Sequence, residues 1–248
     1  MQYDIIIIGA GPGGIYSAYE LTKENPGLKI AVFEGGNPLE KRRCPIDGKK
    51  VTSCIKCKTC AIMSGFGGAG AFSDGKYNIT NNFGGTLYEH IGRQTALDLM
   101  NYVDHINTTH GAENTKLYST AGTRFKKLCL QNKLHLLDAS IRHLGTDLNY
   151  VVLENLYKEL KDKVDFHFNT PVSTVDVLSD GFRVVYGDTS DDCKKCIISV
   201  GRSGSKWMES VCRKLSIPTL SNRVDLGVRV ELPAVIFSHL TDELYESK

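Results

Sequence analysis

The fold is decided near the amino terminus, by the segment YDIIIIGAGPGGIYSAYELTKENPGLKIAVFE at residues 3–34. Four consecutive isoleucines predict a strand that is buried on both faces of a parallel sheet. The glycine-rich turn GAGPGG follows at residues 9–14, and a helix is expected from Ile15 to Lys23. The segment LKIAVFE, residues 28–34, predicts a second strand that ends in an acidic residue. Strand, turn, helix and strand in this order make a βαβ unit.

The turn at residues 9–14 matches the pattern GxGxxG, in which each glycine has its own physical task. The first glycine permits the tight turn, the second lets the backbone approach a pyrophosphate, and the third lets the helix pack closely on the strand. The amides at the helix amino terminus then point toward bound phosphate. Glu34 lies 20 residues beyond Gly14, where a carboxylate can accept the hydroxyl groups of a ribose. The pattern predicts a dinucleotide site with contacts from Gly9, Gly11, Pro12, Gly13, Gly14, Glu34 and Gly35.

The alternative interpretation of the same segment is a glycine turn in a βαβ unit that binds no nucleotide. The strand, the glycines, the helix and the terminal acid all occur in the order that dinucleotide binding needs, which favours the site. A glutamate at position 34 disfavours NADP, because its charge would repel the extra phosphate of that cofactor. The motif alone does not separate FAD from NAD.

Residues 35–85 form a long irregular stretch that is rich in glycine and cysteine. A classical NAD domain would continue here with further βα units, whereas a loop of this length usually has a function of its own. Arg42 and Arg43 follow the acidic residue and could contact a pyrophosphate through charged hydrogen bonds. The alternative is that both are solvated surface charges.

The composition is that of an ordinary soluble globular protein. The chain has 248 residues, 41% of them hydrophobic and 23% charged, which suffices for one large or two modest domains. A formal charge of +2 gives no support to a nucleic-acid partner. The apolar runs are too short to span a membrane, and the amino terminus lacks signal-peptide features, so we expect no membrane association. Eight cysteines fit a reducing compartment, which predicts a cytoplasmic location.

Four cysteines lie within residues 44–60, at Cys44, Cys54, Cys57 and Cys60. The last three form CxxCxxC, and four thiolates at this spacing could bind zinc or an iron–sulfur cluster. A second interpretation is a CxxC pair that shuttles electrons by disulfide exchange. A third is thiols without a function, and the sequence leaves the three open. A further CxxC pair, Cys193 and Cys196, precedes a buried strand, where we expect Cys196 to be a core residue.

The rest of the chain predicts helices and then a meander of strands. Residues 86–110 and 147–163 show helical spacing of apolar positions, with Val151, Val152 and Leu156 on the inner face of the second helix. Residues 164–201 alternate as strands do, with a turn at residues 179–181. The last strand closes on a glycine at position 201.

This order resembles the FAD-binding domain of the glutathione-reductase-like flavoproteins, which have two dinucleotide-binding domains. More closely, the chain resembles a bacterial group of uncharacterised FAD-dependent dehydrogenases in the segments RRCPID, CIKCKTCAIMSGFGGAGAFSDGKYN, IRHLGTDLNY, VGRSGSKWM and VDLGVRVELPA. The resemblance implies an α/β fold: a Rossmann-like FAD-binding domain with a parallel sheet and a β-meander, and an inserted helical and β substrate region. It also implies that FAD is the cofactor.

The resemblance places three further segments beside the cofactor. It implies that the backbone near Val172 contacts the adenine, and that the strand end at Val200, Gly201 and Arg202 returns to the cofactor. The loop GFGGAGAFSDGK, residues 65–76, would lie along the flavin ring, because glycines leave backbone amides accessible. The predicted contacts in this loop are Gly67, Gly68, Ala69, Gly70, Ser73 and Asp74, with Lys76 as an electrostatic partner of the flavin. The alternatives are a turn-forming Asp74 and an exposed Lys76.

Members of that group are longer, and their carboxyl-terminal part completes the flavin site. The expected organisation is a first part of the FAD-binding domain (1–85), a helical insert (86–145), a second part with the meander (146–215) and the start of a substrate domain (216–248). The expected function is an FAD-dependent oxidoreductase, or its FAD-binding half, which transfers hydride to or from an unspecified small-molecule substrate or redox partner. The alternative is a non-catalytic nucleotide-binding subunit that needs a second polypeptide.

Overall fold

The computed structural model describes residues 2–221, 224 and 226–244. The chain forms two compact units, which are described separately. The first unit comprises Met1–Ser73 and Asn149–Ser221, and the second unit comprises Asp74–Leu148 and Asn222–Lys248. The sequence placed its divisions at residues 85, 145 and 215, and the functional assignment of those segments stays a prediction.

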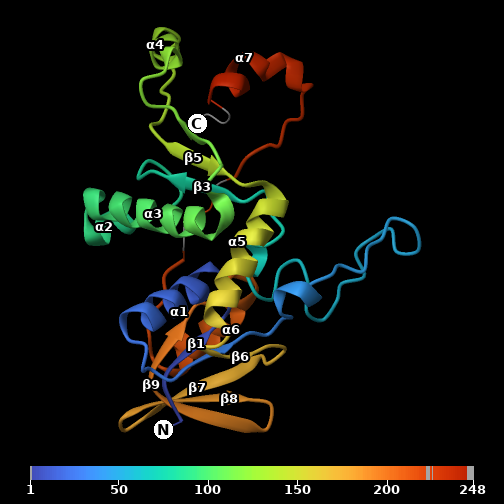
Figure 1. Cartoon of the computed structure of the whole chain (residues 1–248), viewed down its shortest axis with the longest axis vertical. Helices are drawn as coiled ribbons and strands as arrows, with labels where there is room; N and C mark the ends of the chain where they lie inside the picture. Colours follow the sequence, from blue (N-terminus) through green and yellow to red (C-terminus); the bar gives the residue numbers. More distant parts are fainter. Residues whose placement is uncertain (1, 222–223, 225, 245–248) are drawn as a thin grey trace. The chain divides into compact units, whose positions relative to one another are not determined.

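A six-stranded sheet organises the first unit (Figure 1). Its order is β6-β2-β1-β9-β8-β7, in which the first four strands run parallel and the last three form an antiparallel meander. The predicted α/β class, Rossmann-like with a β-meander, is confirmed. The strands are β1 (Tyr3–Ile8), β2 (Ile30–Phe33), β6 (Asp165–His167), β7 (Val172–Leu178), β8 (Gly181–Tyr186) and β9 (Thr189–Ile198).

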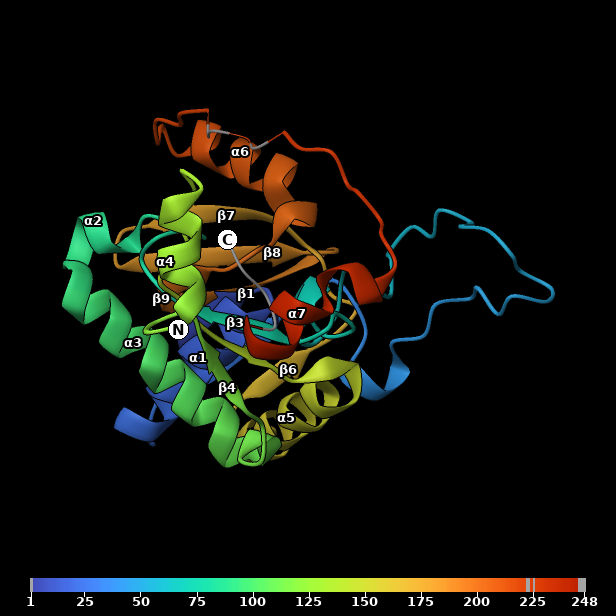
Figure 2. The same ribbon diagram turned by 90° about the horizontal axis from the view of Figure 1, so that it is seen from above.

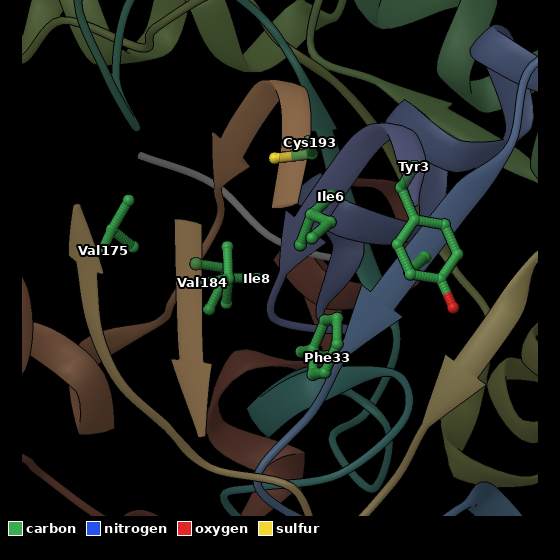
Figure 3. Close-up of a cluster of buried hydrophobic side chains, with 8 residues drawn as sticks. Tyr3, Ile6, Ile8, Phe33, Val175, Val184 and Cys193 are labelled. Atoms are coloured by element: carbon green, nitrogen blue, oxygen red, sulfur yellow. The ribbon is translucent and has the colours of Figure 1, made fainter. Parts of the chain in front are cut away.

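The strand β9 joins the two parts of this sheet because it is ten residues long. Its first half pairs with β8, and its second half pairs with β1, with Ile198 opposite Ile8. One hydrophobic cluster forms where the parallel strands and the meander meet (Figure 3). Its members are Tyr3, Ile6, Ile8, Ala31, Phe33, Val175, Val184 and Cys193. Cys196 packs against this cluster only partly buried, and its hydrogen bond with Cys193 raises the pKa of its thiol.

Helix α1 (Pro12–Glu24) connects β1 to β2. It begins at a proline, whose missing N–H costs nothing in the first turn of a helix. One face is buried through Ile15 and Ala18, both almost inaccessible to solvent. The other helices and short turns of the first unit are α5 (Gly145–Leu160, of which residues 149–160 belong to this unit), α6 (Ser205–Lys214), η1 (Leu39–Lys41), η2 (Gly68–Gly70) and η4 (Arg202–Gly204).

Helix α5 corrects one sequence expectation. Val152 and Leu156 are fully buried, as predicted, but Val151 is 39% exposed and Leu153 is buried in its place. The helix presents a face spaced by three and four residues, and Val151 lies one position outside it. Between η1 and η2, residues 42–67 have no regular structure, and part of this long loop projects from the sheet in Figure 2.

The second unit contains a three-stranded antiparallel sheet of order β3-β5-β4. A buried ion pair ties this sheet to a helix, because Arg142 donates from Nε to Asp104 Oδ1 at 2.6 Å. The single helix predicted at residues 86–110 is two helices, separated at Gly92 by a φ of +85°. The elements are β3 (Lys76–Ile79), β4 (Leu117–Ser119), β5 (Ser140–His143), α2 (Leu87–Ile91), α3 (Arg93–Asn107), the π-turn η3 (Thr108–Ala112), α4 (Arg124–Gln131) and α7 (Ala234–Leu244). Within the part of the chain that the structure describes, no helix is long and apolar enough to cross a membrane.

Replacing Val184 with alanine should lower the free energy of unfolding by about 2 kcal/mol, because it removes buried methyl groups and leaves a cavity. Val184 is fully buried on β8, whereas Val177 on the neighbouring strand β7 is 62% exposed. The matched variant Val177→Ala should change stability by less than about 0.5 kcal/mol. Urea denaturation followed by circular dichroism measures both, and equal losses would contradict the described packing of the meander.

Candidate functional site

A cavity of about 1190 Å³ lies within the first unit, beside the carboxyl ends of β1, β2 and β9. In an open α/β sheet, ligands bind at this edge, where the connections diverge to opposite sides. Most of the residues that the sequence predicted for the cofactor line this cavity. They are Gly9, Gly11, Pro12, Gly13, Glu34, Gly35, Gly68, Ala69, Gly70, Val172, Val200, Gly201 and Arg202.

The glycines of the turn after β1 divide into two kinds. Gly9 has a φ of +103°, and a Cβ there would lie 2.6 Å from the carbonyl oxygen of Ser199. A Cβ on Gly14 would lie 1.9 Å from the carbonyl oxygen of Gly9, so the close approach of helix and strand excludes any side chain. A Cβ on Gly11 would meet nothing nearer than 3.8 Å, at Gly68 Cα. The chain itself therefore needs Gly9 and Gly14, whereas a Cβ on Gly11 would make only an ordinary van der Waals contact, at a position that lines the cavity.

The amino terminus of α1 supplies positive potential to the cavity. The helix is 13 residues long, its first turn has no acidic residue, and no side chain caps its first amides. Pro12 and Gly13 both line the cavity. Unpaired amides and the helix dipole at such an end favour an anionic group. Arg202 adds a positive side chain to the same lining.

The carboxylate of Glu34 connects three segments of the first unit. Its Oε2 accepts a hydrogen bond from the amide of Ala10 at 2.8 Å. Its Oε1 accepts from the amides of Gly36 at 2.8 Å and Gly65 at 2.9 Å. The side chain is buried, yet it borders the cavity. A carboxylate has about four acceptor positions, so Oε2 keeps one that a ligand hydroxyl could use.

The loop after Gly65 is held against the glycine turn. The amide of Gly67 donates to the carbonyl of Ala10 at 2.8 Å, and Gly67 has a φ of +87° that favours glycine. Phe66 is fully buried and its ring meets the edges of Tyr157 and Phe166. Asn149 donates to the carbonyl of Gly70 at 2.9 Å. These contacts place the backbone of Gly68–Gly70 along the cavity.

Arg42 has a different position from the predicted one. Its guanidinium donates to the carbonyls of Ala61 at 2.9 Å, Ile62 at 2.8 Å and Phe66 at 2.6 Å, and it is buried beneath the long loop. Burial lowers the pKa of Arg42, and the nearby Glu34 carboxylate opposes that shift. Arg42 thus supports the loop from within, and the lining of the cavity includes neither Arg42 nor the exposed Arg43.

The four cysteines of residues 44–60 are free thiols. Cys57 and Cys60 line the cavity, whereas Cys44 and Cys54 are exposed outside its lining. Among residues 2–221, 224 and 226–244, no three Cys, His, Asp or Glu side chains lie close enough together to hold a metal ion. The structure therefore does not bring the predicted ligand set together, and the zinc or iron–sulfur site stays a prediction.

The remaining predicted residues of the glycine loop lie outside the cavity lining. Ser73 donates from Oγ to the carbonyl of Gly70 at 2.7 Å, which closes the loop locally. Asp74 and Lys76 belong to the second unit. There, Asp74 Oδ2 contacts His143 Nε2 at 3.1 Å, and Lys76 opens β3 opposite His143. Asp74 thus pairs with an imidazole, and its expected role as a turn former that binds the loop amides stays a prediction.

Sequence reasoning missed several residues of the lining. Ser199 follows β9, and Trp207 stands on α6 just after the strand return at Gly201. The segment VGRSGSKWM predicted that the chain returns to the cofactor here, but nothing in the sequence indicates which of its side chains turns toward the sheet. Further lining residues are Lys58, Thr59, Met63, Ser64, Gly65, Thr170, Pro171, Ser203 and Gly204.

Comparison with known proteins gives one short family match. Residues 1–37 match the Thi4 family, and no curated protein matches the chain. Similar solved structures include a glycine oxidase from Geobacillus kaustophilus, with 13% identity and a TM-score of 0.49 over 86% of this chain and 58% of that one. Another is CtdE in complex with FAD, with 14% identity and a TM-score of 0.43 over 85% and 41% of the two chains.

A third similar structure is the thioredoxin reductase from T. acidophilum, with 12% identity and a TM-score of 0.36 over 80% of this chain and 35% of that one. The chain thus spans less than two thirds of the length of each of these three proteins. The family match covers the βαβ unit of β1, α1 and β2 and ends soon after Glu34.

Replacing Gly14 with alanine should destabilise the first unit by roughly 2 kcal/mol or more, because the new methyl group overlaps the carbonyl of Gly9. Gly27 lies in the same βαβ unit with no atom within 4 Å of its Cβ position. The control Gly27→Ala should therefore stay within about 0.5 kcal/mol of the parent chain. Thermal and urea unfolding test this prediction, which fails when both variants are equally stable.

Replacing Glu34 with glutamine should cost roughly 3 kcal/mol of stability, since the remaining amide oxygen can accept on one side only and the NH2 group leaves at least one of the three buried backbone donors unpaired. The exposed Glu24 at the end of α1 provides a matched control, and Glu24→Gln should have almost no effect. Hydrogen exchange should show faster exchange at Ala10, Gly36 and Gly65 in the Glu34 variant alone. Unchanged protection at those three amides would count against the described role of Glu34.

Proposed function

We propose that this chain is the FAD-binding part of a flavin-dependent oxidoreductase. The observation that carries the proposal is that the uncrowded Gly11, at the amino terminus of α1, and the carboxylate of Glu34 line the same cavity. A pyrophosphate fits the amino terminus of α1, because the amides there and the helix dipole attract negative charge. A ribose fits the carboxylate of Glu34, because Oε2 keeps an acceptor position for a ligand hydroxyl.

The choice of FAD over a nicotinamide cofactor rests on three further features. The cavity of about 1190 Å³ exceeds the roughly 300–1,000 Å³ of ordinary ligand pockets, which suits a large dinucleotide. The backbone of Gly68–Gly70 extends the cavity beyond the phosphate region with a surface that a flat ring could approach. The segments at residues 42–47, 54–78 and 200–208 also carry the resemblance to FAD-dependent dehydrogenases.

When bound, FAD would supply hydride transfer, a reaction that no side chain of the cavity lining performs by itself. The task of this chain is to hold and orient the cofactor. The α1 amino terminus and Arg202 would attract the phosphates, Glu34 would accept from the ribose, and the backbone of Gly68–Gly70 would lie along the ring.

A second function is favoured by the exposed apolar side chains near the end of the described chain. Leu226 is 95% exposed, Val228 is 88% exposed and Val235 is 77% exposed, which is unusual for an unpartnered protein surface. They favour a nucleotide-binding subunit that a second polypeptide completes. In that case the isolated chain would bind FAD, but no electron donor would reduce the bound flavin without the added polypeptide.

The proposal is tested by FAD binding to the purified chain. The chain should retain yellow flavin after desalting, and Gly11→Ala should weaken FAD binding at least about tenfold, because its methyl group occupies the phosphate position. Gly27→Ala serves as the folded control and should bind like the parent chain. Flavin fluorescence titration gives both dissociation constants. Absence of saturable binding, or equal binding by the Gly11 variant, would refute the function proposed here.

A further inference from the structure

We propose that Trp207 forms an adenine subsite at one end of the cavity, so that adenosine diphosphate binds there without the flavin half. This inference rests on the proposed function and names the part of the ligand that supplies the affinity. It also assigns a ligand contact to a side chain whose only other role would be packing between α6 and the meander. Three observations support it: the position of the indole, its fixed orientation and its remaining surface.

The position of Trp207 follows from its neighbours along the cavity. The segment Thr170–Val172 lines the cavity together with Trp207 and lies beside the ribose acceptor. The amide of Thr170 donates to the carbonyl of Glu34 at 2.9 Å, and a Cβ on Gly35 would lie 3.7 Å from Pro171. The base of a nucleotide is attached to the ribose on the side away from the phosphates. With α1 at the phosphates and Glu34 at the ribose, the base extends toward this segment.

The orientation of the indole is fixed by the protein. Its Nε1–H donates to the carbonyl of Ser173 at 2.9 Å, and the ring packs partly buried against the hydrophobic cluster of Figure 3. Helix α6 is anchored to the same sheet, since Val211 is buried and Lys214 pairs with Asp176 on β7. A ring held before the ligand arrives loses little entropy on binding.

The remaining surface of the indole suits a flat aromatic ring. Because the single N–H of the side chain is already used by Ser173, the part that borders the cavity offers no donor. The adjoining Pro171 and Val172 are apolar as well. These three side chains offer no hydrogen-bond donor to a phosphate or a sugar, whereas stacking on an aromatic side chain stabilises a nucleobase. The subsite therefore selects the adenine end of the dinucleotide.

The test uses the fact that Trp207 is the only tryptophan of the chain, so its emission reports this subsite alone. Titration of the full chain with adenosine diphosphate should change the emission saturably. Inorganic pyrophosphate, which lacks the base, should leave it unchanged. FAD binding, measured separately by flavin fluorescence, should weaken about tenfold in Trp207→Leu, which corresponds to about 1.4 kcal/mol. Trp207→Phe keeps an aromatic face and should lose about threefold or less.

Each result decides the inference. An emission change with adenosine diphosphate alone, together with the loss in Trp207→Leu, supports it. Equal emission changes with pyrophosphate, or FAD binding to a folded Trp207→Leu chain as tightly as to the parent, overturns the subsite and leaves the proposed function intact. Circular dichroism establishes folding, and a Trp207→Leu chain that does not fold leaves the decision to the parent titrations. Absence of both FAD and adenosine diphosphate binding overturns both proposals together.

Discussion

The carboxylate of Glu34 is the interaction on which the rest of the site depends. It accepts backbone amides from Ala10, Gly36 and Gly65, which belong to three segments that are distant in the sequence. A buried carboxylate is costly unless it is paired or hydrogen-bonded, and here three donors supply the compensation. The same group that would bind a ribose thus also holds the cavity open in one shape. In the proposed function, the oxygens of this carboxylate would accept both backbone amides and a ribose hydroxyl.

The loop that closes the cavity depends on this carboxylate and on Arg42. Glu34 binds the loop at Gly65 from the sheet side, and Arg42 binds the carbonyls of Ala61, Ile62 and Phe66 from beneath. Backbone donors and acceptors of an irregular segment need partners when they are buried. Two oppositely charged side chains supply those partners where no strand or helix does. A glycine-rich loop can therefore be rigid, although its residues alone favour flexibility.

Particular residues show how far the sequence predicted the site. The strand at Tyr3–Ile8, the turn at Gly9–Gly14 and the strand that ends before Glu34 were all predicted, because neighbouring residues in the chain determine them. The spacing of four cysteines suggests a metal site, at Cys44, Cys54, Cys57 and Cys60. Spacing in the sequence does not determine where side chains lie in an irregular loop, so it could not show whether the four thiols come together. Trp207 escaped prediction, since its place in the cavity depends on how α6 returns to the meander.

The sequence by itself determined the βαβ unit and predicts a dinucleotide as the ligand of its turn. Those features arise from neighbours in the chain: glycines without a Cβ, a helix amino terminus and a strand that ends in glutamate. Only the tertiary structure decided that Arg42 supports the loop from within and that Trp207 borders the cavity. It also decided that Gly9 and Gly14 have no room for a side chain, whereas Gly11 is less crowded. These outcomes depend on contacts between distant segments, where burial and hydrogen-bond partners, not residue type, decide what a side chain does.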